Sequence, residues 1–138
     1  KHFISAFGEH VIGKEVEQAM NEAIQSSEVS INEFTVAPQI NPEEGLPYHE
    51  WFVEFENEPK DFVTFTNVID QSLQVQNSYY KDLIDGKVLR PLKITKVKNE
   101  GFKNYMKSIG KLGGQNKIPR LSNDRKIADE LYNKGLVK

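Results

Sequence analysis

The stretch YHEWFVEF at residues 48–55 alternates large apolar side chains with polar ones, and this period of two predicts a β-strand. Trp51, Val53 and Phe55 fall on one side of the strand, and Glu50 and Glu54 fall on the other. We interpret the glutamate side as the face in contact with water. A pair of carboxylates for general acid chemistry is the alternative.

The segments around this strand predict its neighbours. Residues 29–38 are rich in β-forming side chains, and their alternation changes phase between Ile31 and Phe34, which indicates a bulge. Turn-forming residues at 41–45 connect the two segments, so we expect a hairpin. Two further strands are expected at residues 2–7 and 92–97.

Apolar residues at helical spacing predict four helices, which cover residues 13–27, 59–86 and 102–110 and a last stretch with Ile127, Leu131 and Tyr132. Ser122 or Asn123 would cap the last of them. The order β-α-β-β-α-β predicts the α+β class, with a four-stranded, mainly antiparallel ferredoxin-like sheet covered by helices on one face and two additional C-terminal helices. With 138 residues the chain can form one core, so we expect a single domain over residues 1–138.

The composition excludes several classes of protein. Hydrophobic residues make up 38% and charged residues 28% of the chain, and no apolar run is long enough to cross a bilayer, so we expect a soluble protein without a membrane partner. Because the chain has no cysteine and does not open with a signal peptide, we expect a cytoplasmic location. The absence of cysteine excludes disulfides and thiolate metal sites, and the three histidines are too dispersed for a zinc site. The first residue, Lys1, is not methionine, which is compatible with a piece of a larger protein.

Charge is distributed unevenly along the chain. Residues 1–86 contain only four of the 18 Lys and Arg residues but 16 of the 20 acidic residues, so residues 87–138 are strongly basic. This asymmetry indicates an anionic ligand near the basic end, or simply attraction between the two halves.

The stretch GGQNKIPR at residues 113–120 places a lysine, Lys117, in a loop between the last two helices. A lysine is a mobile point charge suited to phosphate or carboxylate oxygens. Gly113 and Gly114 permit backbone angles closed to other residues, whereas Pro119 favours an extended residue before it. A solvated surface lysine is the alternative interpretation.

Three stretches together resemble the C-terminal domain of the auxin-responsive Gretchen Hagen family of acyl-acid amido synthetases, which belong to the adenylate-forming superfamily. They are KHFISAFGEHVIGKEVEQAM at 1–20, YHEWFVEFE at 48–56 continuing to YYKDLIDGKVLRPLKITKV at 79–97, and FKNYMKSIGKLGGQNKIPRL at 102–121. Their order and spacing, over nearly the whole chain, support the resemblance.

The resemblance implies an ATP-dependent ligase of two steps, in which a carboxylic acid is adenylated and an amino acid then displaces AMP to form an amide. It implies ATP with Mg²⁺ as cofactor of the full-length enzyme, and a larger N-terminal adenylation domain, absent here, as the partner that holds the nucleotide and the acyl substrate. The present domain would then be a mobile lid that binds no cofactor by itself and is inactive in isolation.

The resemblance also implies roles for individual residues. Lys117 matches the catalytic lysine near the C-terminus that reaches the adenylation site, and Arg120 beside it would also contact the nucleotide. Because Gln115 and Asn116 stand before Lys117 where the superfamily often has glycine, Arg120 or Lys111 are alternatives for the mobile cation. Glu9, in the turn after the first strand, would orient the acceptor amine.

Two other functions are compatible with the same residues. One is a stand-alone ferredoxin-like module that binds a small anion or a protein. The other is an RNA-binding domain that uses the basic half, although no stretch interleaves aromatic residues with Lys and Arg. We therefore expect no nucleic acid partner.

Overall fold

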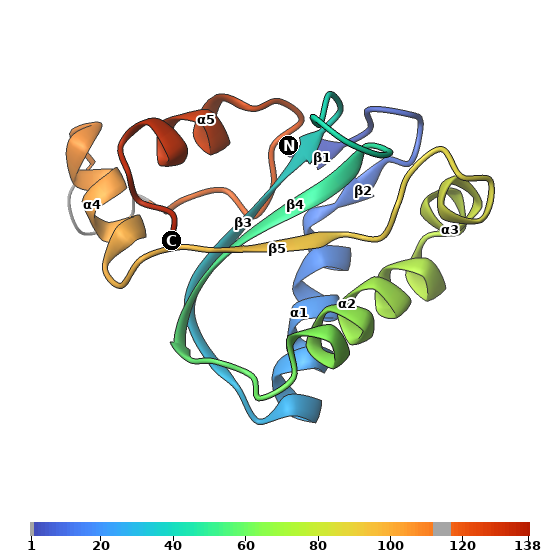
Figure 1. The fold of residues 1–138 in the computed structure, drawn as a ribbon, viewed down its shortest axis with the longest axis horizontal. Helices are drawn as coiled ribbons and strands as arrows, with labels where there is room; N and C mark the ends of the chain where they lie inside the picture. The colour runs from blue at the N-terminus through green and yellow to red at the C-terminus, as the bar shows by residue number, and fades with distance from the viewer. Residues whose placement is uncertain (1, 112–116) are drawn as a thin grey trace.

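The computed structural model describes residues 2–111 and 117–138. Within these ranges the chain forms two small sheets and five helices, shown in Figure 1. In chain order the elements are β1 (Phe3–Ile4), β2 (Val11–Ile12), α1 (Gly13–Ser27), β3 (Ser30–Gln39), β4 (Tyr48–Asn57), α2 (Phe62–Gln76), α3 (Ser78–Asp85), β5 (Lys93–Lys96), α4 (Gly101–Ser108) and α5 (Lys126–Asn133). The expected α+β class is confirmed, and so are the two helices near the C-terminus.

The larger sheet is built on the hairpin that the alternation at residues 48–55 predicts. Its strand order is β3-β4-β5, with β3 and β4 antiparallel and β4 and β5 parallel. A register shift between Ile31 and Glu33 confirms the expected bulge in β3. Helices α2 and α3 form the crossover that a parallel pair requires between β4 and β5.

The expected single four-stranded ferredoxin-like sheet is wrong for the described residues. Such a sheet places the first strand between the two parallel strands, but here β5 pairs directly with β4 and occupies that place. The first strand is only two residues long and pairs with β2 instead, with Ile4 opposite Val11. The loop between β1 and β2 reverses the chain with the help of Gly8 and His10, which adopt positive φ angles of 93° and 46°.

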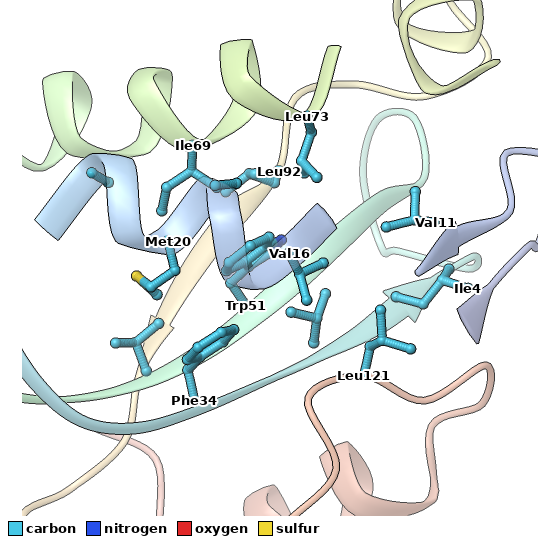
Figure 2. Close-up of a cluster of buried hydrophobic side chains, with 14 of the residues drawn as sticks. Ile4, Val11, Val16, Met20, Phe34, Trp51, Ile69, Leu73, Leu92 and Leu121 are labelled. Carbon is cyan, nitrogen blue, oxygen red and sulfur yellow. The ribbon is translucent and has the colours of Figure 1, made fainter. Parts of the chain in front are cut away.

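One face of the three-stranded sheet packs against α1 and α2 (Figure 1). Figure 2 shows this core, in which Val16 and Met20 of α1 and Ile69 and Leu73 of α2 surround Phe34 and Trp51 of the sheet. The rings of Phe34 and Trp51 stack with centroids 5.5 Å apart. Each large apolar side chain buried in this way contributes about 1.5–3 kcal/mol to folding.

The other face of the sheet is also covered by helices, contrary to our interpretation of the sequence. Phe52 and Ala37 point from that face into a second core, formed with Phe102 and Tyr105 of α4 and Leu131 of α5. Glu50 and Glu54 therefore lie beneath these helices, with only 2% and 4% of their surface exposed. The interpretation of their side of β4 as a solvent-facing surface is wrong, and so is the expectation of helices on one face only.

The helix expected over residues 59–86 is interrupted at Asn77. This residue is extended, with φ −137° and ψ 102°, and its side-chain oxygen accepts a hydrogen bond of 2.9 Å from the Tyr80 amide to cap α3. Because Leu73 and Tyr80 still enter the same core, the apolar spacing continues across the break and hides it in the sequence.

The start of α5 also differs from expectation. Its N-cap is Arg125, and the carboxylate of Asp124 accepts a hydrogen bond from the Lys126 amide. Asn123, one of the two expected caps, instead accepts a hydrogen bond of 2.8 Å from the Ser5 amide. This bond connects the segment before α5 to the N-terminal hairpin, which is formed by β1 and β2. In the ranges that the structure describes, no helix combines the length and apolar character needed to span a bilayer.

Candidate functional site

Lys117 lies at the surface, in the segment of chain that connects α4 to α5. Its side chain is exposed and borders a hollow of about 370 Å³ whose other walls include Glu33, Glu54 and Lys103. Gly113 and Gly114, predicted to give the loop its freedom, lie outside the described residues. Lys111, the alternative cation, is also exposed, and its amide donates a hydrogen bond of 2.8 Å to the Met106 carbonyl after α4.

The residues that follow Lys117 are fixed along the outer edge of β3. The Val36 amide donates to the Arg120 carbonyl, and the Ser122 amide donates to the Val36 carbonyl, each at 2.9 Å. The hydroxyl of Thr35 donates a third hydrogen bond, of 2.6 Å, to the Pro119 carbonyl. Val36 and Leu121 form a parallel bridge, so this short segment extends the sheet by a few residues beyond β3.

Arg120 is engaged by acidic groups of the same domain. Its Nε lies 2.7 Å from a carboxylate oxygen of Glu17 on α1, and its Nη1 donates to the carboxylate of Glu33 on β3. Nη1 also lies 3.1 Å from the Phe34 carbonyl, and the guanidinium stacks 4.5 Å above the Phe34 ring. Burial alone would lower the pKa of Arg120, but the hydrogen bonds and charges of Glu33 and Glu17 raise it.

Glu9 is completely buried, although the sequence places it in a turn. One carboxylate oxygen lies 2.7 Å from Nε2 of His49 on β4, and the other accepts a hydrogen bond of 2.8 Å from the Phe7 amide. Burial acts to raise the pKa of Glu9, but His49 and the Phe7 amide outweigh it and lower the pKa below its ordinary value. Contact between Glu9 and an acceptor amine would require this pair to open.

Glu50 forms a polar cluster that sequence reasoning missed. Its carboxylate accepts hydrogen bonds from Nη1 of Arg125 at 2.7 Å, from the Thr95 hydroxyl at 2.5 Å and from the Tyr132 hydroxyl. Partial burial and the bond to Glu50 raise the pKa of Tyr132 to about 12. Phe52, an aromatic residue on the glutamate side of the strand, was the signal that this face is covered.

The basic C-terminal half pairs extensively with the acidic half. Besides the contacts of Arg120 and Arg125, the ammonium groups of Lys96 and Lys138 both lie within 3.4 Å of the Glu58 carboxylate. Attraction between the halves therefore explains part of the uneven charge distribution. In residues 2–111 and 117–138, no group of His, Asp and Glu side chains is arranged to hold a metal ion.

Comparison with known proteins identifies the family. A model described as the GH3 family C-terminal domain matches residues 14–126, which is most of the chain. Two similar solved structures are "GH3.15 acyl acid amido synthetase", with a TM-score of 0.76 and 19% identity, and "AtGH3.15 acyl acid amido synthetase in complex with 2,4-DB", with a TM-score of 0.74 and 18% identity.

Both structural matches cover 100% of this chain but only 25% and 26% of the matched chains, so this chain spans about a quarter of their length. At these identities the structural likeness shows the fold alone. No curated protein sequence matches the chain. The resemblance noted in the sequence is confirmed by the family match, and the chain belongs to the GH3 family, as its C-terminal domain.

Proposed function

We propose that this chain is the mobile C-terminal domain of an ATP-dependent acyl-acid amido synthetase. The full enzyme would adenylate a carboxylic acid and transfer the acyl group to an amino acid. Membership of the GH3 family and a fold shared with proteins named acyl acid amido synthetases support this proposal. The observation that carries the site assignment is the exposed ammonium of Lys117 at the end of a segment fixed to the sheet.

Lys117 acts in the first half-reaction. When a carboxylate attacks the α-phosphate of ATP and pyrophosphate leaves, negative charge accumulates on the phosphate and the attacking oxygen. An ammonium brought to these oxygens as the site closes stabilises that charge, because water has been expelled from around it. An N-terminal domain of the same protein would hold ATP with Mg²⁺ and the carboxylic acid.

Glu9 belongs to the second half-reaction. Once the acyl-adenylate has formed, the amine of the amino acid displaces AMP, and a carboxylate near the amine orients it for attack. In the present arrangement Glu9 is held by His49, so its participation requires a second arrangement of the N-terminal hairpin.

Pyrophosphate exchange by the full-length enzyme tests the role of Lys117. We expect Lys117→Ala to slow carboxylate-dependent exchange by about a hundredfold or more, the usual effect of removing one such contact. Lys107→Ala, which removes an exposed lysine of α4, is the matched control and should keep the parental rate.

Lys111→Ala distinguishes the two candidate lysines. If that variant is slow and Lys117→Ala is not, the mobile cation is Lys111. A full rate in both variants would remove the lysine mechanism altogether. We also expect the isolated domain neither to hydrolyse ATP nor to exchange pyrophosphate, and activity in the isolated domain would contradict its assignment as a lid.

A further inference from the structure

We propose that Arg120 is a positioning residue, which fixes Lys117 to the three-stranded sheet so that the lysine moves with the whole domain. This inference rests on the proposed role of Lys117. It replaces the expectation that Arg120 itself contacts the nucleotide, because its guanidinium is already engaged by two carboxylates, a backbone carbonyl and an aromatic ring.

The segment after Lys117 is anchored from both sides of the sheet. Ile118 enters the second core, below α4 and α5, while Leu121 enters the first core, where Figure 2 shows it beside Ile4. Ile118 and Leu121 therefore point to opposite faces of the sheet, as residues an odd number of positions apart do in extended chain. Three hydrogen bonds to Thr35 and Val36 hold the backbone between them.

Arg120 connects this segment to two other elements. Its guanidinium reaches Glu17 on α1 and Glu33 on β3 at once, and it also donates to the Phe34 carbonyl. A planar guanidinium carries five N–H donors spread over three nitrogens, whereas an ammonium carries three donors on one nitrogen. A lysine at this position therefore cannot reach the three acceptors and the Phe34 ring together.

The geometry limits how Lys117 can move. Only Ile118 and Pro119 separate it from Arg120, and both belong to the anchored segment. Lys117 therefore reaches an active site when the domain rotates as one body, with its own side chain providing the remaining reach. A displacement of a catalytic group by about 1 Å can reduce a rate a hundredfold, so the anchor has a kinetic effect without contacting the substrate.

Hydrogen exchange of the full-length protein tests the anchor directly. In Arg120→Met the amides of Val36 and Ser122 should exchange faster than in the parent protein. Arg125→Met is the matched control, because it also removes an arginine paired with a sheet glutamate, Glu50, but one that does not hold this segment. Unchanged exchange in Arg120→Met would overturn the proposal, whatever the enzyme's activity.

A double-mutant cycle in pyrophosphate exchange tests whether Arg120 acts through Lys117. Arg120→Met should lower kcat by about tenfold to a hundredfold with little change in the KM for ATP. The double variant Lys117→Ala, Arg120→Met should be no slower than Lys117→Ala alone, because a misplaced lysine and an absent one lose the same interaction. Any loss of rate caused by Arg125→Met should instead multiply with that of Lys117→Ala in the corresponding double variant, because the two residues act independently.

Other outcomes separate the alternatives. A raised KM for ATP in Arg120→Met, or losses that multiply in the double variant, would show direct nucleotide contact and overturn the positioning role. If Lys117→Ala keeps its full rate while Arg120→Met accelerates exchange at Val36 and Ser122, the anchor stands and the proposed function of Lys117 fails.

Discussion

Glu54 illustrates how one buried carboxylate can replace a missing helix cap. The N-cap of α4, Glu100, has a positive φ of 67° and makes no side-chain capping bond. Glu54 on β4 instead accepts hydrogen bonds from the amides of Glu100 at 2.9 Å and Phe102 at 3.2 Å, and from the Asn32 side chain at 3.0 Å. A side chain distant in sequence thus satisfies the first amides of α4.

We predict that Glu54→Gln destabilises the domain by about 1–3 kcal/mol, because a glutamine has only one oxygen for donors that now use both carboxylate oxygens. Urea unfolding monitored by circular dichroism measures the change. Glu56→Gln, at an exposed position of the same strand, is the control and should change stability by less than about 0.5 kcal/mol. Equal stability of the two variants would contradict the capping role.

At the scale of secondary structure elements, the end of β5, the start of α4 and the C-terminus pack closely together. The Val97 amide continues the β5 ladder by donating to the Val53 carbonyl at 2.9 Å, and Val97 also pairs with Val137. A Cβ added at Gly101, the first residue of α4, would lie 2.5 Å from Cγ1 of Val97 and 3.3 Å from the Leu136 carbonyl oxygen. The junction therefore requires a residue without a side chain.

We predict that Gly101→Ala costs about 1–3 kcal/mol, because the added methyl group overpacks this junction. Gly13→Ala, at the first residue of α1, is the matched control. A Cβ there meets nothing within 4 Å, so stability should be unchanged or slightly increased. Thermal unfolding of both variants gives the comparison, and a Gly101→Ala protein as stable as the parent would exclude the close packing.

At the scale of the whole molecule, the N-terminal hairpin is attached to the rest by buried polar contacts. Glu9 binds His49 on β4, and Asn77, between α2 and α3, donates a hydrogen bond of 2.9 Å to the Glu9 carbonyl. The ring centroids of His49 and Tyr80 lie 5.3 Å apart. Burial and the neighbouring Asp70 carboxylate raise the pKa of the Tyr80 hydroxyl well above its ordinary value. Glu9 thus joins the hairpin to the sheet through its carboxylate and to the start of α3 through its backbone carbonyl.

The pKa of Glu9 predicts how stability responds to acid. Because the folded state lowers this pKa below its ordinary value of 4.5, Glu9 contributes stability that is fully present above about pH 4.5 and is lost as the pH falls through the folded pKa. Glu9→Gln should therefore be less stable than the parent at pH 7, and this difference should shrink as the pH falls below about 4.5. Urea unfolding at pH 7, 4 and 3 measures it, and a constant difference would exclude the linkage.

Local patterns predicted most of the elements but not how they associate. Three patterns depend only on residues close together in the sequence: the alternation in β4, the phase change near Ile31 and the apolar stripe of α1. Each of them therefore predicts its element correctly from the sequence alone. The break at Asn77 was hidden because both flanking helices bury residues in one core. For the candidate site, the sequence indicated Lys117 as exposed, but it could not indicate that Arg120 is engaged by Glu17 and Glu33, which lie far away along the chain.

The sequence by itself determined the α+β class, the central hairpin and the family, because these depend on periodicity and on the order of recognisable stretches. Only the tertiary structure decided that β5 pairs directly with β4 and that helices cover both faces of the sheet. The reason is that the same glutamate side chain is stable in water or beneath a helix that supplies donors to it. For Glu50 and Glu54 those donors come from residues 95, 125 and 132 and from residues 32, 100 and 102, which folding alone brings to the strand.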